Sequence, residues 1–327
     1  MELSYERWYR KNLRRSFSSV GWTLVVYYLI MNVAVILTVI VEMIVRMMGK
    51  IASGNAEGIM TAVEEAAGSG WGYFLAVAVG LVILLCWKKK RFWKEEIWAK
   101  GRPMTPGSFL GILCIFLGCQ SVYQLLAMAV EAVLNVFGLS IVEGMESMAA
   151  DSSNFSMFLY MGILAPVAEE ILFRGLIQKT LMPYGRKFAI FCSAFAFGIF
   201  HGNLLQSAYA FLVGLVLGYV ASEYSIAWAM VLHMINNLVV ADMLTRLTAG
   251  LPGLAADLIV SGIIWAFTIG AIVVAVVKRK KIGAWLRRER MNGLYVKCFF
   301  SNAGMIVLMI LMGLSMLMMA FLMINPI

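Results

Sequence analysis

Apolar residues form nine long blocks along the chain, separated by shorter polar or basic segments. A helix needs about 20 apolar residues to cross the hydrocarbon core of a membrane. By this criterion the pattern predicts nine membrane-spanning helices, at residues 21–45, 71–87, 107–130, 156–178, 188–203, 205–222, 226–245, 255–277 and 303–323. We therefore expect an all-α polytopic membrane protein.

The composition of the 327 residues agrees with this prediction, with 62% apolar residues, 14% charged residues and a mean hydropathy of +0.85. A soluble domain carries about 45–50% apolar and about 25% charged residues. These values exclude a soluble enzyme, a disordered chain and a disulfide-stabilised secreted module. The five cysteines show no CxxC spacing, and cysteines in apolar segments behave as small hydrophobic residues.

The net charge of +9 comes mainly from four basic segments, which contain 23 of the 27 Lys and Arg residues and span residues 7–15, 88–102, 179–187 and 278–297. If the amino terminus is cytoplasmic and nine helices alternate in direction, all four segments face the cytoplasm. Cytoplasmic loops of membrane proteins are enriched in Lys and Arg. We predict a cytoplasmic amino terminus, an external carboxyl terminus and no nucleic-acid partner, with a bacterial plasma membrane as the expected location.

Ionisable residues inside the predicted spans are the strongest functional signal, because a charge at mid-bilayer costs at least ~2.5–3.5 kcal/mol. Glu169, Glu170 and Arg174 lie in the span at 156–178. Arg174 follows Glu170 by four residues, so the two share a helix face in the favourable order. Glu169 points about 100° away, and we expect the two carboxylates to have different roles. A purely structural ion-pair network is the alternative.

Both histidines of the chain lie in later spans, each with a partner one helical turn away. Phe197 and His201 share one helix face, and His233 and Asn237 share another. An imidazole and an amide on one face can donate hydrogen bonds to a developing oxyanion. The structural alternatives are a histidine bonded to a backbone carbonyl and polar hydrogen bonding between helices in lipid. Asn236 faces elsewhere and is interpreted as structural.

The segments EEILFR, FGIFH and HMINN occur in this order on successive predicted spans, starting at Glu169, Phe197 and His233. Together they resemble the three motifs of the type II CAAX prenyl proteases and of their bacterial relatives, the CPBP or Abi intramembrane proteases. The resemblance covers about residues 107–245. It implies a helical bundle that holds a polar cavity within the membrane, and it implies peptide-bond hydrolysis.

The resemblance also implies roles for the motif residues. Glu169 and His201 would activate water, His233 and Asn237 would stabilise the tetrahedral oxyanion, and the remaining motif residues, Glu170, Arg174 and Phe197, would organise the site. Zinc could be held by Glu169, His201 and His233, since zinc accepts both ligand types. The sequence contains no HExxH motif. We favour a mechanism in which the glutamate acts without a cofactor, and a zinc-dependent mechanism is the alternative.

The sequence therefore predicts three regions. Residues 1–106 contain a basic segment, two spans and a second basic segment with Trp residues that is expected at the membrane interface. Residues 107–245 form the protease-like core, and residues 246–327 contain two further spans joined by a basic cytoplasmic loop. The expected partners are membrane lipids and a membrane-associated or lipidated peptide substrate, and no oligomeric state is indicated. The alternative function is a non-catalytic scaffold or a transporter with a buried Glu–His proton relay.

Overall fold

The computed structural model describes residues 2–54, 58–145, 154–248 and 250–326, and in this part the chain is almost entirely helical. Seven described helices are long and apolar enough to cross a membrane: Glu6–Ala52, Thr61–Trp87, Pro106–Asn135, Phe155–Tyr184, Leu204–Glu223, Gly253–Arg288 and Ala303–Met323. Each corresponds to one of the predicted spans. The protein is an all-α polytopic membrane protein, as predicted.

Two of the nine predicted spans correspond to shorter helices, so the count of nine is approximate. The span predicted at 188–203 is the 15-residue helix α9 (Arg186–Phe200). The span predicted at 226–245 starts as the 10-residue α-helix α11 (Ile226–Ile235) and continues as the π-helical segment η6 (Asn236–Met243). The predicted interfacial segment 88–102 contains only a five-residue π-helical turn, η1 (Phe92–Glu96), of which the Phe92 side chain is buried.

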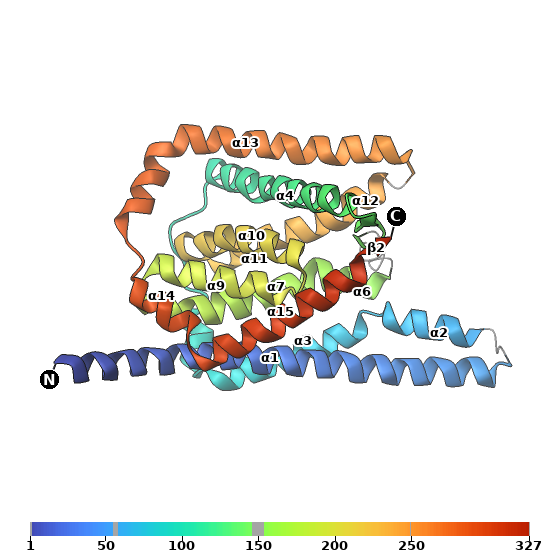
Figure 1. The fold of residues 1–327 in the computed structure, drawn as a ribbon, viewed down its shortest axis with the longest axis horizontal. Coiled ribbons are helices and arrows are strands. Elements are labelled where there is room, and N and C mark those ends of the chain that lie inside the picture. Colours follow the sequence, from blue (N-terminus) through green and yellow to red (C-terminus); the bar gives the residue numbers. More distant parts are fainter. Residues whose placement is uncertain (1, 55–57, 146–153, 249, 327) are drawn as a thin grey trace.

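The elements follow one another as α1 (Glu2–Ala52), α2 (Gly58–Ala67), α3 (Trp71–Trp87), η1, α4 (Pro106–Asn135), β1 (Leu139–Ser140), α6 (Phe155–Leu159), η3 (Tyr160–Leu164), α7 (Ala165–Glu170), η4 (Ile171–Gln178), α8 (Lys179–Leu181), η5 (Met182–Tyr184), α9, α10 (Leu204–Glu223), α11, η6 (Asn236–Met243), α12 (Leu244–Thr248), α13 (Gly253–Arg288), α14 (Gly293–Phe300), α15 (Ala303–Met323) and β2 (Asn325–Pro326). Strands β1 and β2 pair antiparallel. In Figure 1, α1 runs along one edge of the molecule and α4 and α13 along the opposite edge, with α7, α9, α10 and α11 between them.

Polar residues at the starts of the long helices define where those helices begin. The side chains of Thr105, Asn203, Ser225 and Asn302 each accept a hydrogen bond from a backbone N–H in the first turn of α4, α10, α11 and α15, respectively. Such side chains satisfy N–H groups that have no partner inside the helix. This matters within a membrane, where water does not solvate an unpaired backbone group.

Small residues allow the central helices to approach closely. A Cβ atom added at Gly198 of α9 would lie 2.8 Å from the carbonyl oxygen of Ser207, and one added at Gly214 of α10 would lie 3.2 Å from the Cα atom of Ala194. Helices α1 and α15 cross in the same way, since a Cβ atom at Gly21 would lie 2.4 Å from the carbonyl carbon of Gly304. Close packing of small residues is a common way to associate helices in lipid.

Three π-helical segments interrupt the helices that carry the motif residues. They are η3, η4 and η6, and they lie immediately before α7, immediately after Glu170 and immediately after α11. π-Helical turns are rare and occur frequently at functional sites. Three of the four π-helical segments in the described part of the chain therefore lie close to Glu169, Glu170 and His233.

Candidate active site

The two adjacent carboxylates of α7 lie in different environments. The Glu170 side chain is completely buried, whereas 31% of the Glu169 side chain is exposed. Glu170 Oε1 lies 3.0 Å from Arg174 Nη1, and the Arg174 side chain is also completely buried. The ion pair predicted from the four-residue spacing is confirmed, and so is the different placement of the two carboxylates.

Arg174 also connects the carboxylate to two neighbouring helices. Its Nη2 donates a hydrogen bond to the carbonyl oxygen of Gly214 at 3.3 Å, and its guanidinium lies 4.2 Å from the centre of the Phe197 ring. A buried charge needs such additional partners, because the ion pair alone does not offset the loss of hydration. Arg174 thereby holds η4, α9 and α10 around Glu170.

His233 contacts both carboxylates, an arrangement that the sequence did not predict. Its Nδ1 lies 3.0 Å from Glu170 Oε1, and its Nε2 lies 3.7 Å from Glu169 Oε2. An ionised carboxylate can only accept a hydrogen bond, so Nδ1 donates to Glu170. Nε2 then faces Glu169. The imidazole of α11 is therefore held beside the partly exposed carboxylate of α7.

His201 is positioned by the backbone of its own helix. Its Nδ1 lies 2.9 Å from the carbonyl oxygen of Phe197, and because a carbonyl accepts, Nδ1 carries the proton and Nε2 has the free lone pair. The Phe197 ring packs edge-on against both imidazoles, with ring centres 4.9 Å from His201 and 5.7 Å from His233. The predicted contact between Phe197 and His201 is confirmed.

Glu169 and His201 line one cavity of about 350 Å³. No direct hydrogen bond between Glu169 and His201 is present among the described residues, and each has a group that can accept a hydrogen bond, a carboxylate and an imidazole nitrogen. A single water molecule has two protons and could donate one to each group. Whether these two groups act on a water molecule depends on the function of the site.

Neither His233 nor Asn237 is among the residues that line the cavity, and Asn237 has its own partners. Its amide nitrogen donates to the carbonyl oxygen of Met161 at 2.8 Å, and its Oδ1 accepts from Asn236 Nδ2 at 3.1 Å. Asn236 in turn accepts a hydrogen bond of 2.7 Å from the Tyr209 hydroxyl. These hydrogen bonds agree with the structural interpretation of Asn236, whose role stays a prediction. One N–H of the Asn237 amide is used by Met161, and the amide group has a second one.

In the described ranges, no group of three or more His, Cys, Asp or Glu side chains is placed to hold a metal ion. Glu169, His201 and His233, the three ligands considered from the sequence, do not form such a group in the structure. His233 instead has its Nδ1 on Glu170 and its Nε2 toward Glu169.

Comparison with known proteins gives one match, to residues 151–239. The matching family is described as type II CAAX prenyl endopeptidase Rce1-like. Residues 151–239 form an Rce1-like domain. No curated protein and no solved structure gives a significant match to the chain. The first residues of the matched segment, 151–153, lie outside the described part of the structure, and the match includes all seven residues singled out from the motifs.

Helices outside the Rce1-like domain complete the cavity at Glu169. Tyr27, Tyr28 and Asn32 of α1 and Tyr73 of α3 line it together with Tyr160 of η3. These residues were not predicted to line the site, because an uncharged tyrosine in an apolar span does not by itself indicate a function. A tyrosine pair within the first span was the available hint.

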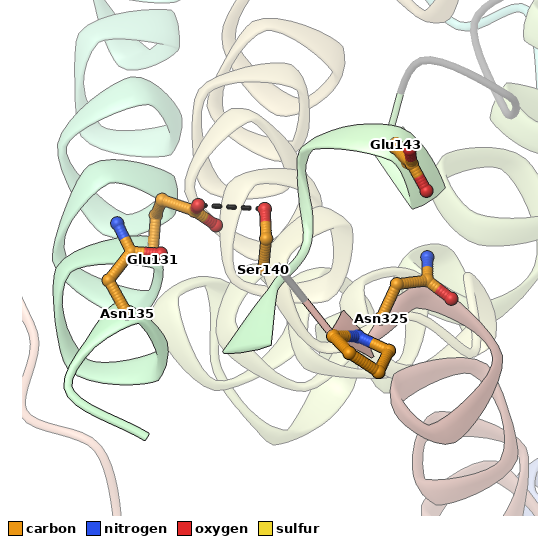
Figure 2. Close-up of a pocket in the computed structure, with 6 residues that line it drawn as sticks. Glu131, Asn135, Ser140, Glu143 and Asn325 are labelled. Atoms are coloured by element: carbon orange, nitrogen blue, oxygen red, sulfur yellow. Dashed lines mark hydrogen bonds between the residues drawn. The ribbon is translucent and has the colours of Figure 1, made fainter. Parts of the chain in front are cut away.

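A second cavity, of about 410 Å³, lies where β1 meets β2. It is lined by Glu131, Asn135, Ser140, Glu143, Asn325 and Pro326. Figure 2 shows Ser140 directed toward Glu131, to which its hydroxyl donates a hydrogen bond of 2.8 Å. No residue of the three motifs lines this cavity, so we do not assign it to the Rce1-like site.

Proposed function

We propose that the protein is an intramembrane endopeptidase that hydrolyses a peptide bond of a membrane-associated or lipidated peptide or protein. The observation that carries the proposal is that Glu169 and His201 of an Rce1-like domain share one cavity. The buried group of Glu170, Arg174 and His233 behind Glu169 supports it. A scaffold would not require buried charges beside a cavity.

In the proposed reaction, a water molecule donates to Glu169 and to His201 Nε2. Glu169 takes its proton as the water oxygen attacks the scissile carbonyl, which is general-base catalysis. His233, 3.7 Å away from Glu169, then receives the proton on Nε2, and Glu170 stabilises the resulting imidazolium through Nδ1. Once protonated, His233 donates through Nε2–H to the oxyanion together with Asn237, and this proton passes to the leaving amine as the C–N bond breaks.

The test is cleavage by the purified full chain in liposomes. The probe is an internally quenched peptide that ends in a farnesylated Cys-Val-Ile-Met sequence, and the same peptide without the lipid is assayed in parallel. We expect the wild type to cleave and Glu169→Gln to lose cleavage while remaining folded. Glu143→Gln is the matched control, since Glu143 is an exposed carboxylate in the other cavity. No cleavage of either peptide by the wild type, combined with proton-coupled uptake of solute, would favour the transporter alternative.

We also propose that the basic loops face the cytoplasm. In a background without native cysteines, thiols introduced at positions 95 and 283 should react only with membrane-permeant reagents, and a thiol at position 145 should react with impermeant ones. The reverse labelling pattern would place the basic loops outside the cell and position 145 in the cytoplasm, and would contradict the proposed orientation. This measurement is independent of the chemistry.

A further inference from the structure

The cavity at Glu169 is built by two parts of the chain that are distant in sequence. Glu169 and His201 belong to the Rce1-like domain, whereas Tyr27 belongs to α1 and Tyr73 to α3, which both lie outside the matched segment. Helices α1 and α3 pack against each other. The candidate site is therefore incomplete without the amino-terminal helices.

Tyr27 is the most enclosed of the tyrosines in this cavity, with only 5% of the residue exposed. Its ring lies against α3 at Gly80, where an added Cβ atom would be 2.7 Å from Tyr27 Cε2. On the other side its ring centre is 6.2 Å from that of Phe200, the residue before His201. The absence of a side chain at Gly80 thus allows the tyrosine to lie between α3 and α9.

The Tyr27 hydroxyl has no hydrogen-bond partner among the residues that the structure describes, and Tyr27 lines the same cavity as Glu169. The hydroxyl oxygen is not among the fully enclosed polar atoms without a partner, so it is accessible from the cavity. A molecule in the cavity can therefore supply this hydroxyl with a donor or an acceptor. Peptide groups supply both.

We infer that α1 forms one wall of the substrate-binding site and that Tyr27 holds the substrate by a hydrogen bond to its peptide backbone. This inference rests on the proposed function. Among the residues that the structure describes, those lining the cavity include no Lys or Arg, and Glu169 is the one acidic group. The cavity therefore takes an uncharged stretch of peptide, and an acidic side chain next to the scissile bond is disfavoured by repulsion from Glu169.

The first test measures binding separately from cleavage. A fluorescent form of the farnesylated probe is titrated against Glu169→Gln, with and without Tyr27→Phe. One hydrogen bond is worth about 2- to 12-fold in affinity, and we expect Tyr27→Phe to weaken binding by this factor with no fall in the melting temperature. Tyr184→Phe is the matched control, because Tyr184 packs on Phe17 of α1 and does not line the cavity. Unchanged affinity in Tyr27→Phe would overturn the inference.

Failure of the proposed function gives a different pattern. If Glu169→Gln binds the probe, Tyr27→Phe weakens binding and the wild type cleaves nothing, the binding site stands and the protease activity does not. If the wild type cleaves and Tyr27→Phe binds and cleaves normally, the activity stands and the role of Tyr27 is wrong. An acidic residue beside the scissile bond should weaken binding to the wild type more than to Glu169→Gln.

A second test does not require a substrate. In a chain without native cysteines, Tyr27→Cys should react with N-ethylmaleimide, because position 27 opens into the cavity. Leu24→Cys, one turn earlier on α1, should stay unreacted, since Leu24 is completely buried. Labelling at 27 alone supports the wall formed by α1, and no labelling at 27 overturns it.

Discussion

The two cavities described above are similar in volume, and each contains glutamate side chains. At the β1–β2 cavity, the Glu131 carboxylate accepts hydrogen bonds from Ser140 Oγ at 2.8 Å and from the backbone N–H of Ile141 at 2.9 Å, and Glu143 is exposed (Figure 2). At the other cavity, Glu169 is adjacent in the chain to Glu170, which forms a fully buried ion pair with Arg174. Glu169 also lies near the buried His233.

The difference shows that burial of charge distinguishes the candidate active site better than cavity volume does. Exposed carboxylates keep their hydration and need few partners, whereas Glu170 and Arg174 have lost it. Breaking such a buried pair is costly, and a charge inside a membrane is a functional candidate. The following changes test whether the two cavities differ in function as this contrast requires.

The largest effect is expected from His201→Ala. It removes one of the two groups proposed to hold the attacking water, and loss of a general acid–base group lowers the rate by about 10²–10⁴-fold. The peptide cleavage assay measures kcat/KM, and thermal melting checks the fold. Glu143→Gln in the β1–β2 cavity should cleave normally. Equal losses in both variants would remove the distinction between the two cavities.

Arg174→Ala should lower stability and activity together. It leaves Glu170 as an unpaired buried charge, which costs about 3–5 kcal/mol. The exposed ion pair of Arg91 with Glu95, where 78% and 67% of the side chains are exposed, is the matched contrast. Arg91→Ala should cost at most about 0.5 kcal/mol. Denaturation in mixed micelles measures both variants, and similar melting behaviour for the two would show that Arg174 is solvated.

Asn237→Ala distinguishes an oxyanion donor from a structural amide. Loss of one oxyanion donor lowers kcat by about 10²–10³-fold. Asn236→Ala removes the acceptor for Tyr209 and should lower the melting temperature, with kcat reduced less than in Asn237→Ala. If Asn237→Ala changes only the melting temperature, its contact with Met161 is its whole role.

A smaller effect is expected from Glu131→Ala at the β1–β2 cavity. The change removes the acceptor for Ser140 and Ile141 and should lower the free energy of unfolding by about 1 kcal/mol. Cleavage by the remaining folded protein should not change. A loss of kcat in this variant would connect the second cavity to the reaction.

Chelation should have the smallest effect. The wild type, incubated with a strong chelator and then assayed, is expected to keep its cleavage rate, and the active preparation should contain substoichiometric zinc by mass spectrometry. Metal binding would require deprotonated ligands and would weaken at low pH. Stoichiometric zinc, with activity lost on chelation and restored by zinc, would show that the metal-free proposal is wrong.

Features that depend on residues near one another in the chain could be predicted well. The apolar blocks located the helices because insertion of a helix in lipid depends on its own side chains. The pair of Glu170 with Arg174 and the contact of Phe197 with His201 follow from positions one turn apart on a single helix. Orientation across the membrane, the roles of the motif residues and the absence of a metal requirement stay predictions.

Contacts between helices that are distant in the chain could not be predicted from the sequence. His233 is 63 residues from Glu170 in the chain, and its place between the two carboxylates depends on how α11 packs on α7. The π-helical segments also change the direction in which side chains point, so that regular α-helical spacing does not predict it. The tyrosines of α1 carry no signal until α1 is packed beside α3 and the Rce1-like domain.

The sequence by itself determined that this is a helical membrane protein, where its buried charges lie, and which family its central segment resembles. These properties depend on local hydrophobicity, helical periodicity and short motifs. Only the tertiary structure decided that His233 contacts Glu170, that Glu169 and His201 share a cavity, and that α1 closes it. The physical reason is that small residues such as Gly80 and Gly214 set the approach of the helices, and that approach decides which side chains meet.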